Sequence, residues 1–186
     1  PRFTDAVELY HDWAPDGKAF FLLRRSEAKK LSQIILRDFR SGTEKEIYRT
    51  SFYFTHGLSC SPDGKWLAFS RLDETDGEKE VLGVISTAGG KPRELYRCNN
   101  NDAFATITWT PDAQYILFEK FKSGEDKCNL WRISINGGEP QKLGFERPFY
   151  NYSRMSLQPD GRHIAFCTSS NPKTAGLWVM ENFLSK

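Results

Sequence analysis

The 186-residue chain is long enough to bury a hydrophobic core as one domain. Its mean hydropathy of −0.58 excludes a membrane-embedded body, and no apolar run approaches the roughly 20 residues of a spanning helix. The net charge of +2 comes from Lys and Arg scattered among Asp and Glu, which argues against a nucleic-acid-binding face.

A tight turn recurs four times along the chain. Pro has the φ that a type I turn needs, Asp can bond its own backbone, and Gly takes the positive φ that closes a hairpin. The turns are Pro15-Asp16-Gly17, Pro62-Asp63-Gly64, Pro111-Asp112-Ala113 and Pro159-Asp160-Gly161. Successive aspartates are 47, 49 and 48 residues apart. This fixed period predicts an array of identical supersecondary units.

Each turn is predicted to join two strands. The residues three positions before each Asp are mostly large or apolar and have polar or small neighbours: Trp13, Cys60, Trp109 and Leu157. The first strand of each repeat therefore alternates with period two. After the turn the chain is continuously apolar, as in 20–22 and 67–69. A strand of that kind is covered on both faces.

Two further strands follow in each repeat. Residues 34–47, 82–95 and 130–143 align without a gap, and each segment contains an apolar strand, a Gly-bearing turn and a short strand ending in Ile or Leu. Each repeat is therefore predicted to form a four-stranded antiparallel sheet. Four such sheets at this period predict an all-β fold made of β-propeller blades.

The repeat motifs resemble a known family. S-P-D-G-K-x-L-A-F, T-P-D-A-x-x-I-L-F and Q-P-D-G-x-x-I-A-F, each followed by a strand similar to L-W-x-I, resemble the WD40-like repeats of TolB and related bacterial periplasmic proteins. They also resemble the propellers that precede some prolyl peptidase domains. The resemblance covers nearly the whole chain and implies a periplasmic or extracytoplasmic location. Propellers host many activities, so the fold alone fixes no function.

We interpret residues 1–186 as one partial propeller domain with repeats at approximately 5–50, 51–98, 99–146 and 147–186. The register predicts three full blades and a three-stranded fourth blade, because the chain stops before another strand fits. We therefore expect the four repeats to belong to a ring of six to eight blades. The open blade edges are expected to self-associate.

The four cysteines show no metal-binding spacing. No C-x-x-C pair occurs, which argues against zinc. Cys60 and Cys167 fit strands as small buried hydrophobic residues. Cys98 and Cys128 are both expected near blade ends, and the sequence leaves open whether they form a disulfide.

The short turns are expected on one face of the propeller and the longer, variable connections on the other, where recognition commonly occurs. Two inter-blade connections are rich in aromatic residues. Because aromatic and Arg side chains commonly anchor interfaces, the candidate partner contacts are Tyr53, Phe54, Arg147, Phe149 and Tyr150. The alternative is that these rings wedge between blades and are structural.

Other polar clusters give weaker signals. Asp73, Asp76 and Glu78 resemble part of a cation-binding loop, but they lack its full spacing, so we interpret them as an exposed hairpin tip. No catalytic motif is present, the three histidines fall at unrelated offsets in the repeats, and no cofactor or metal is predicted.

Two functional hypotheses remain. The chain is either a non-catalytic scaffold that binds a protein or peptide through its variable face, or the propeller of a peptidase or glycan-processing enzyme. In the second hypothesis the catalytic residues lie outside this chain.

Overall fold

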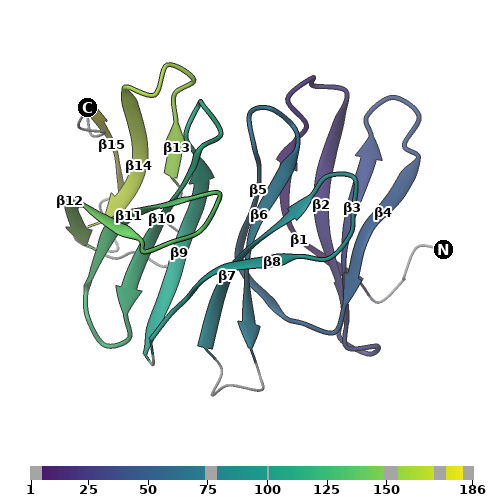
Figure 1. Cartoon of the computed structure of the whole chain (residues 1–186), viewed down its shortest axis with the longest axis horizontal. Coiled ribbons are helices and arrows are strands. Elements are labelled where there is room, and N and C mark those ends of the chain that lie inside the picture. Colours follow the sequence, from purple (N-terminus) through teal and green to yellow (C-terminus); the bar gives the residue numbers. More distant parts are fainter. Residues whose placement is uncertain (1–5, 74–78, 100, 149–154, 170–174, 182–186) are drawn as a thin grey trace.

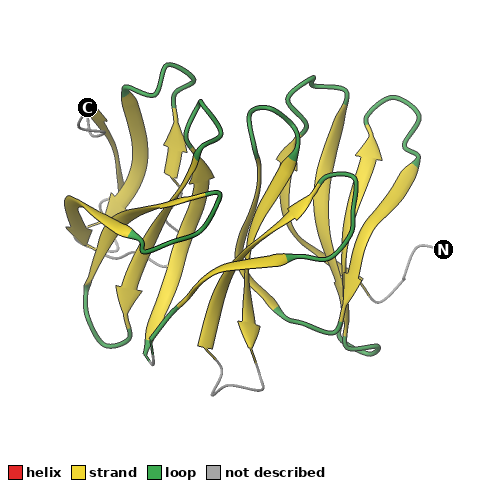
Figure 2. Ribbon diagram, viewed as in Figure 1, coloured by secondary structure: helices red, strands yellow, loops and turns green. Residues whose placement is uncertain are grey.

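The computed structural model describes residues 6–73, 79–99, 101–148, 155–169 and 175–181. Within these ranges the chain forms fifteen β-strands and no helix. The strands make four antiparallel sheets, which stand next to one another as the blades of a propeller (Figures 1 and 2). The predicted all-β propeller fold is therefore confirmed.

In each sheet the strands pair in the order of the sequence. Blade 1 contains β1 (Ala6–Trp13), β2 (Ala19–Ser26), β3 (Leu31–Asp38) and β4 (Glu44–Thr50). Blade 2 contains β5 (Phe54–Cys60), β6 (Trp66–Asp73), β7 (Lys79–Ser86) and β8 (Arg93–Arg97). Blade 3 contains β9 (Asp102–Trp109), β10 (Tyr115–Lys122), β11 (Lys127–Ser134) and β12 (Gln141–Pro148). In the described residues, blade 4 contains β13 (Met155–Leu157), β14 (His163–Ser169) and β15 (Ala175–Glu181).

The four Pro-Asp turns adopt the geometry that the sequence predicts. In blade 2 the Gly64 amide donates to the Ser61 carbonyl at 2.8 Å, and Asp63 Oδ1 accepts from the Lys65 amide at 3.1 Å. Gly64 has a φ of 72°. Ala113 takes the equivalent position in blade 3 and also has a positive φ, 56°. The turn is therefore specified by its hydrogen bonds as well as by Gly.

The hydrophobic core consists of layers between neighbouring blades. Leu23 and Ile34 of blade 1 pack with Phe54, Phe69 and Ile85 of blade 2 in one buried cluster. Similar clusters join blades 2 and 3 and blades 3 and 4. This arrangement explains why the second strand of each repeat is apolar on both sides, since both of its faces are covered.

The two kinds of connection lie on opposite edges of the array. In Figure 1 the Pro-Asp hairpins β1–β2, β5–β6 and β9–β10 are at the top, and the β2–β3 and β10–β11 connections are at the bottom. We call the second edge the variable face. None of the described residues belongs to a helix that is long and apolar enough to cross a membrane.

Candidate binding site

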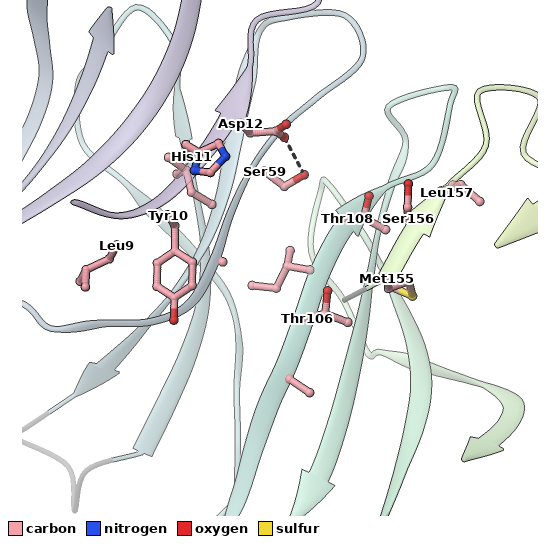
Figure 3. A pocket seen from close by; sticks show the side chains of 14 residues that line it. Leu9, Tyr10, His11, Asp12, Ser59, Thr106, Thr108, Met155, Ser156 and Leu157 are labelled. Carbon is pink, nitrogen blue, oxygen red and sulfur yellow. Dashed lines mark hydrogen bonds between the residues drawn. The ribbon is translucent and has the colours of Figure 1, made fainter. Parts of the chain in front are cut away.

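The first strands of all four blades surround a pocket of about 330 Å³ (Figure 3). Strands β1, β5, β9 and β13 each contribute three or four consecutive residues to its wall. Because these strands are the first in their sheets and pair on one side only, the pocket lies where the blades converge. We call it the central pocket.

Small polar side chains recur around the central pocket. The residue four positions before each turn aspartate is polar in every repeat, and all four of these residues line the pocket: Asp12, Ser59, Thr108 and Ser156. The repeats therefore share a polar lining position as well as the Pro-Asp turn. Each blade contributes at least one residue with a carboxylate or hydroxyl side chain to the lining.

Hydrogen bonds between blades fix this wall. Asp12 Oδ2 accepts from the Cys60 amide at 2.8 Å and from Ser59 Oγ at 3.3 Å, which links β1 to β5. Tyr10 donates its hydroxyl proton to the Thr55 carbonyl. Trp109 Nε1 donates to the Ser59 carbonyl at 3.0 Å, which links β9 to β5. A ligand would therefore meet a largely preformed surface.

The polar groups in the lining of the pocket are suited to hydrogen bonding. Asp12 Oδ1 accepts from the Trp13 amide at 2.9 Å, so both carboxylate oxygens of Asp12 already have donors within the chain. Thr108 and Ser156 line the pocket, and their hydroxyls can donate and accept hydrogen bonds. In the described part of the chain, no group of three or more His, Cys, Asp or Glu residues is placed to hold a metal ion.

Three of the five predicted partner contacts lie in the part of the chain that the structure describes. Tyr53 lies between β4 and β5, is 38% exposed, and stacks on the Arg25 guanidinium, whose carbon is 4.6 Å from the ring centroid. Phe149 and Tyr150 lie outside the described residues. Tyr53 is thus the one exposed member of the predicted set in the part of the chain that the structure describes.

Phe54 and Arg147 are interior residues, which corrects their prediction as partner contacts. Phe54 is 1% exposed and packs edge-on against Phe69, with ring centroids 5.2 Å apart. For Phe54 the alternative interpretation, a ring wedged between blades, is the correct one. Arg147 is 4% exposed because it pairs with the buried carboxylate of Glu119. Neither side chain is available to a partner in this structure.

The structure describes one residue of the predicted acidic hairpin tip and both cysteines of the possible disulfide. Asp73 is 8% exposed, and its Oδ2 accepts from Arg97 Nη1 at 2.7 Å, so its charge is paired within blade 2 rather than presented at a hairpin tip. Asp76 and Glu78 lie outside the described residues. Cys98 and Cys128 are buried free thiols, so the disulfide that the sequence left open is not formed.

The central pocket was not predicted from the sequence, although a signal for it was present. The residues four positions before the turn aspartates are polar in all four repeats. Reading that register as one lining position per blade would have identified the pocket. The aromatic residues of the inter-blade connections are the more conspicuous signal in the sequence, and they led to the partner contacts predicted above.

No protein-family model matches the chain, and no curated protein matches its sequence. Solved structures do match. TolB from Acinetobacter baumannii is 20% identical, with a TM-score of 0.70 over 95% of this chain and 41% of that one. Prolyl oligopeptidase B from Galerina marginata is 14% identical, with a TM-score of 0.64 over 95% of this chain and 27% of that one. The β-propeller domain of the Trilobed protease from Pyrococcus furiosus is 18% identical, with a TM-score of 0.62 over 96% and 55%.

This chain therefore spans less than two thirds of the length of each of these proteins. At such low identities the likeness establishes the fold. The chain is a β-propeller that resembles TolB and the propeller domains of peptidases.

Proposed function

We propose that the chain is a non-catalytic β-propeller scaffold that binds a peptide segment of a protein partner in the central pocket. One observation carries this proposal: the first strand of each blade (β1, β5, β9 and β13) supplies a small polar residue to the same pocket. Such a site forms only when the four blades pack together. Holding residues from separate blades in one place is the role of a recognition scaffold.

The size and chemistry of the pocket suit a peptide. Its volume of about 330 Å³ fits a short segment, and Leu9 and Met155 add apolar surface beside the polar groups. A peptide backbone offers alternating donors and acceptors, which the hydroxyls of Thr108 and Ser156 can satisfy. Tyr53 would add a contact where the partner extends over the variable face.

Peptide display against the immobilised chain, followed by titration of the selected peptides, tests the proposal. Ser156→Tyr fills the pocket from an exposed position, so the selected peptides should bind at least about tenfold more weakly to this variant. Glu139→Tyr places the same ring on an exposed turn outside the pocket and should leave affinity unchanged. Equal affinities for both variants would place the peptide elsewhere and refute the proposal.

The second candidate function is that of a propeller attached to a peptidase domain. It is favoured by the likeness to prolyl oligopeptidase B and to the Trilobed protease propeller. The complete reading frame separates the two candidates, because a hydrolase domain encoded in it would support the peptidase. A frame without one would exclude that candidate. An extracytoplasmic location stays a prediction from the repeat motifs, and fractionation of the source cells checks it.

A further inference from the structure

A second pocket, of about 390 Å³, lies between the outer parts of blades 1 and 2. Its lining combines apolar and cationic side chains: Tyr48, Phe52, Phe69, Val81, Arg71 and Lys91. Phe69 and Val81 are buried and form the floor, whereas Lys91 is exposed at the rim. We call this space the Arg71 pocket. It shares no lining residue with the central pocket.

Arg71 is held in place without strong hydrogen bonds. Its guanidinium carbon lies 4.1 Å from the centroid of the Phe52 ring, in a cation–π contact. The nearest carboxylate oxygens are those of Glu94 at 3.7 Å and Asp73 at 3.8 Å, both beyond hydrogen-bonding distance. Arg71 Nη1 is buried and has no hydrogen-bond partner in the described structure.

A neighbouring arginine explains why these carboxylates leave Arg71 unsatisfied. Arg97 donates to both oxygens of Glu94, at 3.0 and 2.8 Å, and to Asp73 at 2.7 Å. The two acids are therefore already engaged by a better-placed cation. Arg71 keeps a positive charge and donor capacity next to an apolar cavity, an arrangement that an anionic group would complete.

At the equivalent boundary between blades 2 and 3, the corresponding cation is hydrogen-bonded and lies over a tryptophan ring. Lys120 occupies the position of Arg71, eight residues after the turn aspartate, and donates to Asp102 at 3.1 Å and to the Tyr96 hydroxyl at 3.3 Å. Trp131 stands where blade 2 has Gly83, and the Lys120 ammonium lies 4.7 Å from its ring centroid. Blade 2 therefore differs from blade 3 at two positions that line the pocket, since Arg71 lacks the hydrogen bonds that Lys120 makes and Gly83 stands in place of a tryptophan.

We propose that the Arg71 pocket binds an apolar group that carries a carboxylate. Arg71 would donate to the carboxylate, and Phe52, Tyr48 and Phe69 would contact the aromatic or aliphatic body. Lys91 and Arg93 at the rim add positive charge against the single acid in the lining, Glu94. The ligand is either a small free carboxylate or the C-terminal residue of a peptide, which present the same chemistry.

The first experiment needs no variant. N-acetyl-phenylalanine and its primary amide differ only in the carboxylate, and each is titrated into the chain and followed by amide chemical shifts in NMR. The acid should bind with a Kd on the order of 1 mM, as expected for a ligand of this size. The amide should bind roughly tenfold or more weakly, because a charge-assisted hydrogen bond is lost. Equal binding of acid and amide, or no binding of either, would overturn the proposal.

Variants then locate the site. Arg71→Met should weaken binding of the acid to the level of the amide, whereas Lys120→Met removes the equivalent cation of blade 3 and should leave binding unchanged. Ser156→Tyr should also leave it unchanged, so failure of the central-pocket proposal would be distinguishable from failure of this one. Unchanged binding to Arg71→Met would overturn the assignment to Arg71.

A last comparison separates the two ligand sources. A hexapeptide that ends in phenylalanine with a free carboxylate is compared with 3-phenylpropionate. Tighter binding of the hexapeptide identifies a peptide C terminus as the ligand, and equal affinity identifies a small carboxylate.

Discussion

Arg147 and Glu119 form a doubly hydrogen-bonded ion pair in the interior of the propeller. Arg147 Nε and Nη2 lie 2.5 and 2.6 Å from the two Glu119 carboxylate oxygens, and the side chains are 3% and 1% exposed. Arg147 Nη1 also donates to the carbonyl of Cys167 in β14 at 3.3 Å. The pair therefore fixes the end of β12 to β10 and connects blade 3 to blade 4.

Removing one partner of this pair should be costly. Arg147→Met leaves the Glu119 carboxylate buried without its counter-charge, and we expect a loss of about 3–5 kcal/mol in the free energy of unfolding. The double variant Glu119→Leu/Arg147→Met removes both charges and should lose less than Arg147→Met alone. Urea denaturation measures both. Lys127→Met, which breaks an exposed pair with Glu146, is the control and should have little effect. A double variant as unstable as the single one would contradict this account.

This ion pair also shows what the sequence could and could not predict. The Pro-Asp turns were predictable because their geometry is set by three or four adjacent residues, and the blades followed from the regular spacing of those turns. Arg147 is separated from Glu119 by 28 residues, and their contact depends on how β10 pairs with β11 and β11 with β12. The aromatic residues near Arg147 in the sequence therefore led to its prediction as a partner contact, whereas its guanidinium is buried.

The two pockets differ in how well they could be predicted from the sequence. The central pocket corresponds to a polar position repeated in every blade, so part of its lining can be read from the repeat once the first strands of the blades are known to converge. The Arg71 pocket depends on differences between blades, such as Gly83 in blade 2 where blade 3 has Trp131. It depends also on the competition of Arg97 for nearby acids, which is a matter of distances that no sequence pattern carries.

The buried thiols should be unreactive in the native protein. Burial raises the pKa of Cys60, Cys98 and Cys128 to about 12 each. Roughly one such thiol in ten thousand is then ionised at pH 8, so iodoacetamide should label these residues only after denaturant unfolds the chain. Cys167 is partly exposed and serves as the internal comparison. Mass spectrometry of the labelled peptides reports each site, and rapid native labelling of Cys98 or Cys128 would contradict the structure.

Two turn glycines should differ in their tolerance of a methyl group. Gly17 has a φ of 67° and nothing within 4 Å of an added Cβ, so Gly17→Ala should cost only the left-handed backbone strain, roughly 1 kcal/mol. Gly161 has a φ of 72°, and an added Cβ would lie 3.2 Å from Pro111 Cγ in the neighbouring turn. Gly161→Ala should therefore cost more than Gly17→Ala in urea denaturation. The reverse order would show that the turns do not pack against one another as described.

The exposed side of blade 4 should drive self-association. Leu177 and Val179, on β15 at the edge of the described sheet, are 73% and 60% exposed. Apolar side chains on an edge strand favour pairing with a second chain, whereas lysines there oppose it. Sedimentation velocity over a range of concentrations should show association of the wild-type chain and a shift towards monomer for Leu177→Lys/Val179→Lys. Asn136→Lys/Glu139→Gln adds the same charge on an exposed turn and should associate as the wild type does. A wild-type chain that stays monomeric, or an equal shift in both variants, would rule out an edge-specific contact.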